Sequence, residues 1–202
     1  DEFNVTMIWH KETTIQKIDL LVLPGGFSYG DYLRCGAIAA KSPIMSAVKK
    51  FYDDGGFIIG ICNGFQILTE SSLLPGALLR NKKLKFICKY VNLLIENNST
   101  PFTSKYKKNE KIKIPIAHNE GNYFADEKTL NDLQNNEQIV LKYCDENLNI
   151  NDESNPNGSS LNIAGIINKN KNVIGMMPHP ERCVEDILGG TDGSGIFQSL
   201  LN

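Results

Sequence analysis

Short apolar runs separated by polar turns dominate the first third of the chain. Residues 20–23 and 57–61 are almost entirely aliphatic, as in strands that are buried on both faces of a sheet. Between them, apolar residues recur at helical spacing over residues 44–52. Because a strand, a helix and a second strand in this order form a βαβ unit, we expect an α/β fold with a mostly parallel central sheet flanked by helices.

The remaining pattern contains no break that would mark a second domain. Further strands are predicted over residues 86–95, 112–116, 139–143, 163–167 and 173–177, and a terminal helix over residues 196–201. Residues 145–160 are rich in Asn, Ser, Asp and Glu and contain Pro156 and Gly158, which is typical of a flexible loop. We therefore expect residues 1–202 to form a single domain.

The second aliphatic run ends at a cysteine between two glycines, in the order Gly60-x-Cys62-x-Gly64. A helical pattern follows, so Cys62 is predicted to lie on a sharp strand-to-helix turn, where enzymes with a nucleophile elbow place their nucleophile. The glycines let the strand and the helix approach closely, and the N-terminal field of the helix favours the thiolate form of Cys62. The alternative is a cysteine that only packs in the core after a buried strand.

A thiol nucleophile needs a base, and one of the chain's histidines lies beside a carboxylate. His179 stands between two prolines, which disfavour helix, so His179 and Glu181 are expected in an extended stretch with their side chains on one face. Glu181 would then orient the imidazole, and His179 would take the proton of Cys62 and pass it to a leaving group. These residues predict a Cys-His-Glu triad; the alternative is a proline-rich turn with a surface His and Glu.

Acyl transfer also needs donors for a developing oxyanion, and a glycine turn after the first aliphatic run offers them. The backbone N–H of Gly26 or Phe27, together with that of Asn63 after the nucleophile, is predicted to form an oxyanion hole. The alternative is an ordinary turn, because Pro-Gly-Gly sequences commonly mark turns.

Several stretches, taken together, resemble one family. Beyond the elbow and the Pro178-His179-Pro180-Glu181 ending, they cover residues 24–39, 73–78, 81–88, 115–124 and 163–182. These stretches resemble the class I (triad) glutamine amidotransferases, and among them the glutaminase subunits of phosphoribosylformylglycinamidine synthase. The resemblance covers nearly the whole chain, and it implies the flavodoxin-like three-layer architecture of that family.

The resemblance implies a reaction and roles for individual residues. Cys62 would attack the side-chain amide of glutamine, His179 would protonate the departing ammonia, and water would then release glutamate. Substrate contacts are expected from Gln66, one turn after the nucleophile, and from His118 in a glutamine-binding loop. A buried helix Gln and a His that bonds only within its own loop are the alternatives. The family usually has glycine at the position of Asn119, so the contacts of this loop stay open.

The resemblance also implies partners. A synthetase subunit would receive the ammonia and convert formylglycinamide ribonucleotide to formylglycinamidine ribonucleotide in de novo purine biosynthesis, assisted by a small accessory subunit. ATP and magnesium would belong to the synthetase, so no cofactor or metal is expected in this chain. Two other functions stay open: a catalytically silent regulatory subunit with an amidotransferase fold, and a stand-alone γ-glutamyl hydrolase.

Composition narrows the class of protein further. The chain is 41% hydrophobic and 22% charged with a formal net charge of −2, which suits one sizeable core and lacks the basic footprint of a nucleic-acid-binding protein. Its five cysteines have neither metal-ligand spacing nor a paired pattern, which suits a reducing compartment. No apolar run has the length of a membrane span. We expect a cytoplasmic protein that binds neither nucleic acid nor membrane.

In the family, a strand, a glycine turn and a helix precede the segment with which this sequence begins at Asp1. Such elements take about 20–25 residues, and their loss exposes an edge of the sheet. We therefore expect the domain as given to lack its N-terminal strand and helix, and the sequence to belong to a longer polypeptide. The triad is unaffected.

Overall fold

The computed structural model describes residues 3–31 and 34–201. Tyr32 and Leu33, which belong to the 24–39 stretch of the resemblance, lie outside the described residues. The helices are α1 (Met45–Asp53), α2 (Asn63–Glu70), α3 (Glu127–Asn135) and α4 (Ser194–Gln198). The strands are β1 (Leu20–Leu23), β2 (Phe57–Ile61), β3 (Ala77–Leu79), β4 (Ile87–Ile95), β5 (Lys111–His118), β6 (Asn122–Phe124), β7 (Ile139–Cys144), β8 (Ile163–Ile167) and β9 (Val173–Met176).

A seven-stranded sheet in the order β1-β2-β9-β8-β7-β4-β5 forms the centre of the molecule, and β3 pairs with β6 in a separate two-stranded sheet. The strands β1, β2 and β9 are parallel, whereas every pairing from β9 across to β5 is antiparallel. The α/β class and the flanking helices are confirmed, but the sheet is mixed and the expectation of a mostly parallel sheet is wrong. Residues 168–172 join β8 to β9 and are too few for a parallel crossover, which takes about ten or more residues.

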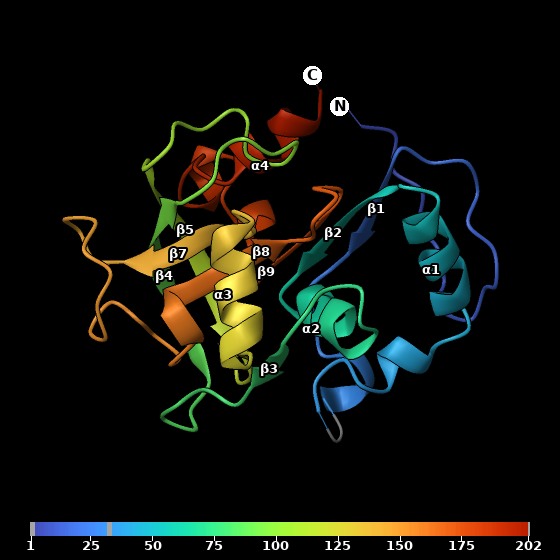
Figure 1. The fold of residues 1–202 in the computed structure, drawn as a ribbon. Helices are drawn as coiled ribbons and strands as arrows, with labels where there is room; N and C mark the ends of the chain where they lie inside the picture. The colour runs from blue at the N-terminus through green and yellow to red at the C-terminus, as the bar shows by residue number, and fades with distance from the viewer. Residues whose placement is uncertain (1–2, 32–33, 202) are drawn as a thin grey trace.

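The core lies on both faces of the central strands. All residues of β8 and β9 are buried, which explains why their sequences are continuous apolar runs rather than alternating ones. Helix α2 packs against β1, β2 and β9, and Figure 1 shows α2 beside the parallel strands and α3 over the antiparallel ones. Within this core, the ring of Phe65 on α2 stacks on that of Tyr123 with centroids 5.9 Å apart. Helix α2 is therefore held firmly at the parallel end of the sheet.

Part of the loop between β7 and β8 differs from its prediction. Asn157 and Ser159 are buried, and the side-chain Nδ2 of Asn157 donates to the carbonyl of Gly121 at 2.7 Å. The side-chain oxygen of Asn155 accepts hydrogen bonds from the backbone N–H groups of Gly158 and Ser159. Asn side chains replace backbone partners in such turns, so residues 155–159 form a packed turn. Residues 146–153 are exposed, and their flexibility stays a prediction.

The end of the chain also departs slightly from the predicted helix over residues 196–201. Helix α4 begins at Ser194 and ends at Gln198, and a 3₁₀ turn, Ser199–Leu201, follows it. Helices commonly tighten to 3₁₀ geometry in their last turn, so the difference lies in the ends of the element and not in its existence.

Candidate active site

Cys62 is the only residue between β2 and α2, as the flanking glycines predict. Its backbone has φ 50° and ψ −104°, a conformation that costs a residue with a side chain about 1–3 kcal/mol. A Cβ on Gly64 would overlap the carbonyl oxygen of Leu23 in β1, and one on Gly60 would overlap the side chain of Leu68 in α2. Only glycine at both positions lets the strand and the helix cross this closely and hold the strained turn.

His179 lies three residues after β9, the strand next to β2. In the pairing of these strands Ile61 is the partner of Met176, so the segments that leave the two strands start side by side. The backbone N–H of His179 donates to the carbonyl of Pro115 in β5 at 2.9 Å. The backbone of His179 is therefore hydrogen-bonded to β5, the edge strand at the antiparallel end of the sheet.

The His179–Glu181 pair forms as predicted, although the backbone between them is not extended. The distance from His179 Nδ1 to Glu181 Oε1 is 2.7 Å, but residues Pro180–Arg182 form a 3₁₀ turn. Pro180 occupies the first position of this turn, where its fixed φ is favourable and its missing N–H costs nothing. The prediction of an extended stretch is wrong, because proline favours the start of a helical turn as readily as an extended chain.

The hydrogen bond to Glu181 also decides the tautomer of His179. A carboxylate only accepts hydrogen bonds, so Nδ1 carries the proton and Nε2 keeps its lone pair. Nε2 is buried and has no hydrogen-bond partner among the described residues. His179 therefore presents a free acceptor inside the protein, which is the state a general base needs before it receives a proton.

Gly25 shows how close the base and the nucleophile are. A Cβ placed on Gly25 would lie 2.7 Å from His179 Cε1 and 3.5 Å from the Cβ of Cys62. The turn after β1 therefore borders both side chains, and the missing side chain of Gly25 leaves the space in which the two groups face each other.

The protonation state of Cys62 is decided by burial rather than by the helix field. Burial raises the pKa of the Cys62 thiol to about 12, and the charges of Glu181 and Asp31 raise it further. The backbone N–H of Asn63 and the charge of Arg182 lower this pKa, but by less. In the resting site Cys62 is a neutral thiol that donates to the carbonyl of Ala117 at 3.6 Å. The N-terminal end of the helix does favour the thiolate, as predicted, but burial by distant segments outweighs it.

The three predicted oxyanion donors lie around the nucleophile. The backbone N–H of Asn63 follows the nucleophile directly and lowers the pKa of the Cys62 thiol. Within residues 3–31 and 34–201, neither the N–H of Gly26 nor that of Phe27 has a protein acceptor. Gly26 has φ 154° and Phe27 is exposed. These N–H groups are available, and their role as an oxyanion hole stays a prediction.

Gln66 lies in a chain of hydrogen bonds that begins at the turn after β1. The backbone N–H of Ser28 donates to Asn63 Oδ1 at 3.3 Å, and Asn63 Nδ2 donates to Gln66 Oε1 at 2.8 Å. Gln66 Nε2 in turn donates to the carbonyl of Glu120 at 2.6 Å. Both ends of the Gln66 amide are engaged, so this side chain fixes the loop around Glu120, and its predicted contact with substrate stays a prediction.

His118 at the end of β5 is a second buried imidazole near the triad. Its Nδ1 lies 3.0 Å from Asn81 Oδ1, and the Nδ2 of Asn81 donates to the carbonyls of His118 and Lys85. Asn81 Oδ1 therefore accepts, Nδ1 of His118 donates, and Nε2 is left as a buried acceptor without a partner among the described residues. Burial, and then the charge of His179, lower the pKa of His118 to about 4, so it is neutral at pH 7.

Sequence reasoning did not assign a structural role to Asn81, which also accepts from the N–H of Gly121 at 3.1 Å. Its only signal was its place in a stretch shared with the family. Asn119, where the family usually has glycine, is exposed, and its φ is not positive. Its carbonyl accepts from the N–H of Asn81 at 2.8 Å. The loop thus has no need of glycine at this position.

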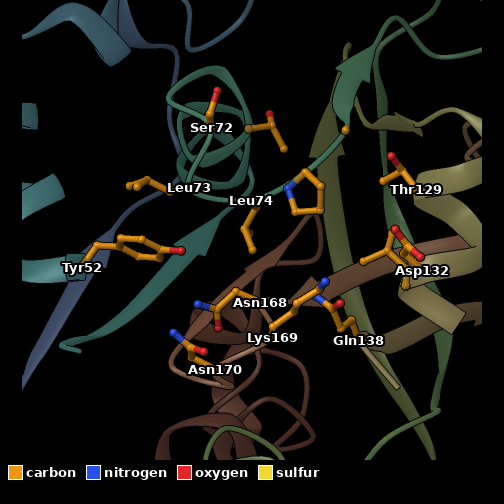
Figure 2. Close-up of a pocket in the computed structure, with 14 residues that line it drawn as sticks. Tyr52, Ser72, Leu73, Leu74, Thr129, Asp132, Gln138, Asn168, Lys169 and Asn170 are labelled. Carbon is orange, nitrogen blue, oxygen red and sulfur yellow. The ribbon is translucent and has the colours of Figure 1, made fainter. Parts of the chain in front are cut away.

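A cavity of about 590 Å³ lies away from these residues. It is bordered by Thr69 and Ser72 at the C-terminal end of α2, by Asp132 of α3, and by the turn over residues 168–170 (Figure 2). Cys62 stands at the other end of α2. The candidate active site is therefore the cluster around Cys62 and not this cavity.

Between residues 3 and 201, apart from 32 and 33, no group of three or more His, Cys, Asp or Glu side chains is arranged to hold a metal ion. No helix in the same residues combines the length and the apolar character that crossing a bilayer requires.

Comparison with known proteins places the chain in a family. Residues 1–190 match the model of the CobB/CobQ-like glutamine amidotransferase domain. The phosphoribosylformylglycinamidine synthase subunit PurQ of Rhodopseudomonas palustris is 56% identical, covering 98% of this chain and 85% of the relative. The subunit of the same name from Moorella thermoacetica is 54% identical over 98% of this chain and 84% of its own length.

A solved structure agrees with these relatives. The structure of PurLQS from Thermotoga maritima contains a chain that is 49% identical and superposes with a TM-score of 0.82, covering 94% of this chain and 81% of that one. The sequence and the fold of this protein therefore both match one group of proteins. The same protein has the strand-to-helix cysteine, the His-Glu pair and the mixed sheet described above. The chain belongs to the CobB/CobQ-like glutamine amidotransferase family and, within it, to the PurQ subunits of phosphoribosylformylglycinamidine synthase.

Proposed function

We propose that this chain is the glutaminase subunit of phosphoribosylformylglycinamidine synthase and that Cys62, His179 and Glu181 carry out the hydrolysis. Its relatives bear the name of that subunit over nearly the whole of this chain. The observation that carries the catalytic assignment is the state of His179, whose Nδ1 is bound by Glu181 while the buried Nε2 has no partner among the described residues. Nε2 of His179 can therefore accept the proton of the neutral Cys62 thiol.

The first half of the reaction forms a thioester. His179 Nε2 takes the proton of the Cys62 thiol as the sulfur attacks the side-chain carbonyl carbon of glutamine. The carbonyl oxygen becomes an oxyanion, which the N–H of Asn63 and that of Gly26 or Phe27 stabilise by about 3–4 kcal/mol per donor. The imidazolium gives its proton to the amide nitrogen, the carbon–nitrogen bond breaks, and ammonia leaves.

The second half restores the enzyme. His179 Nε2 takes a proton from water, whose oxygen attacks the thioester carbon, and the proton then passes to the leaving sulfur of Cys62. Glutamine and water are thereby converted to glutamate and ammonia. Glu181 stabilises the imidazolium in both halves, which matters here because the pKa of the thiol is about 12 and a free thiolate is scarce.

The ammonia is the product that the complex uses. The synthetase subunit, with a small accessory subunit, takes it to convert formylglycinamide ribonucleotide to formylglycinamidine ribonucleotide in purine biosynthesis. The Thermotoga maritima relative was solved as PurLQS, which supports an assembly of this kind for this chain. We place ATP and magnesium in the synthetase subunit and no cofactor in this chain.

All five cysteines of the chain are free thiols. Free thiols persist in reducing compartments, which supports our placing the chain in the cytoplasm. No feature of the site favours a silent regulatory subunit or a stand-alone γ-glutamyl hydrolase over the glutaminase.

The test is glutamate release from glutamine by the chain assembled with its synthetase and accessory subunits, ATP, magnesium and formylglycinamide ribonucleotide. We expect release that depends on Cys62 and is lost in Cys62→Ala. Cys88→Ala is the matched control, since Cys88 is exposed and lies in β4. Equal glutamate release by wild type and Cys62→Ala would refute the assignment. If the chain alone releases glutamate as fast as the assembled complex, the result would favour the stand-alone hydrolase.

A further inference from the structure

The mechanism leaves one carboxylate beside the nucleophile without a role. Asp31 ends the 3₁₀ turn Ser28–Asp31, which follows the glycine turn of the predicted oxyanion hole. Tyr29, Gly30 and Asp31 have φ of 54°, 66° and 52°, a left-handed run that is rare for residues with side chains. The turn that carries Asp31 contacts the helix of the nucleophile, because the backbone N–H of Ser28 donates to Asn63 Oδ1 at 3.3 Å. The charge of Asp31 also contributes to the raised pKa of the Cys62 thiol.

The carboxylate of Asp31 is only partly satisfied. The nearby side chain of Cys35 lowers the pKa of Asp31, but Asp31 Oδ1 is buried and has no hydrogen-bond partner within the described residues. Burial raises the pKa of Asp31, and the negative charge of Glu120 raises it further. A buried carboxylate oxygen without a donor costs free energy, and a cation beside it would remove that cost.

The neighbouring carboxylate does not share this state. Glu120 Oε2 accepts from the backbone N–H of Cys35 at 3.1 Å, and Glu120 Oε1 lies 3.8 Å from Arg80 Nε. Glu120 thus has partners on both oxygens, while Asp31 has one oxygen open. Because Arg80 balances the charge of Glu120, the open oxygen of Asp31 is the acceptor in this pair of carboxylates that favours an added cation.

A second observation comes from the loop that carries Glu120. His118 is 2% exposed, and its Nε2 is a neutral acceptor that is buried and unpartnered in the part of the chain that the structure describes. His118 follows Ala117, whose carbonyl accepts from the Cys62 thiol at 3.6 Å, and the charge of His179 contributes to the lowered pKa of His118. Asp31 Oδ1 and His118 Nε2 are therefore two buried acceptors to which no donor among the described residues is hydrogen-bonded.

We propose that Asp31 binds the α-ammonium group of the glutamine substrate. This inference rests on the proposed function, because it takes glutamine as the substrate that Cys62 attacks. The α-ammonium is the cationic group of glutamine and offers three N–H donors, which suits a carboxylate with an open oxygen. The α-carboxylate of the substrate must then lie away from Asp31 and Glu120, since like charges repel. Asp31 therefore sets the direction of the substrate and selects amides that carry an α-amino group.

The experiment compares L-glutamine with glutaramic acid, which has the same side-chain amide and α-carboxylate but no α-amino group. Binding is measured by calorimetry to the chain assembled with its synthetase subunit, in a Cys62→Ala background that cannot turn substrate over. When Asp31 is retained, L-glutamine is expected to bind more tightly than glutaramic acid. Asp31→Asn should weaken binding of L-glutamine by about 10- to 100-fold, as expected for loss of a charged hydrogen bond, and so remove most of the preference.

Asparagine preserves the shape of Asp31 and tolerates a left-handed backbone, so the variant is expected to fold. Asp31→Glu, which keeps the charge, should retain part of the preference, and Asp132→Asn at the remote cavity should retain all of it. An unchanged preference in Asp31→Asn would overturn the inference. Because the readout is binding, it is independent of the Cys62-dependent release that tests the proposed function: if release fails while Asp31→Asn still removes the preference, the inference stands.

Discussion

The protonation state of Cys62 gives a quantitative prediction about its reactivity. The pKa of the thiol is raised to about 12 by burial, so at pH 7 the thiolate is about one part in 10⁵. An ordinary exposed thiol has about 3% thiolate at this pH, roughly 10³-fold more. In a His179→Ala variant no base remains to take the proton. Alkylation of Cys62 at pH 7 should then be slower than that of an ordinary thiol by about that factor.

The assay is the rate of carbamidomethylation by iodoacetamide, followed by mass spectrometry of the peptide that contains Cys62. Between pH 7 and pH 10 the rate in His179→Ala should rise by about tenfold per pH unit without a plateau, because a raised thiol pKa keeps the reactive form scarce over this whole range. Cys88 in the same sample serves as the exposed internal comparison. Wild type should react faster at pH 7, since His179 takes the proton as the sulfur attacks.

A plateau below pH 9 in His179→Ala would refute this reasoning. It would mean that the helix field and Arg182 outweigh burial, and that Cys62 is a preformed thiolate. Equal rates in wild type and His179→Ala at pH 7 would also contradict it, because His179 would then have no part in activating the thiol.

Three substitutions test the geometry around the triad. Gly64→Ala should lower the free energy of unfolding by about 1–3 kcal/mol in urea titrations, because its Cβ overlaps the Leu23 carbonyl. Gly25→Ala should leave the unfolding midpoint nearly unchanged but lower kcat by about 10²-fold, because its Cβ displaces the His179 ring. Glu181→Gln should lower kcat by about 10²–10⁴-fold in the glutaminase assay, because an amide does not stabilise the imidazolium.

The two glycine variants control for each other, since one is expected to change stability and the other turnover. Wild-type stability in Gly64→Ala would contradict the close contact between α2 and β1, and wild-type kcat in Gly25→Ala would contradict the placement of His179. For Glu181, the control is Glu153→Gln on the exposed part of the loop between β7 and β8. If both Glu variants have the same kcat, the carboxylate of Glu181 has no role in turnover.

The sequence predicts the strands and the elbow well because both depend on local chemistry. The aliphatic runs over residues 20–23, 57–61 and 163–167 coincide with β1, β2 and β8. The glycines on either side of Cys62 indicate a close crossing of a strand and a helix, and this signal lies within a few residues of sequence. Strands β3 and β6 have three residues each, which is too short to give a periodic signal.

Strand direction and the chemistry of the site depend on distant contacts and were not predictable. The antiparallel half of the sheet follows from short connections and from packing, and aliphatic runs look alike in both kinds of sheet. The neutral state of Cys62 depends on burial by segments that are distant in sequence, such as the one around Ala117. The engagement of Gln66 by Asn63 and Glu120 likewise needs the loop and the helix to be placed first.

The pairing of Ile61 with Met176 has a consequence for how the enzyme becomes active. The nucleophile and its base follow neighbouring strands that are far apart in sequence, so they meet only after a long loop has closed, and such closure is slow. A slip of one residue would move the base along the strand by about 3.3 Å and turn the side chains of β9 to the opposite face. Recovery of turnover during refolding should therefore not precede the pairing of β2 with β9. A chain in which these two strands have not paired should therefore be unable to hydrolyse glutamine, because His179 is not yet beside Cys62.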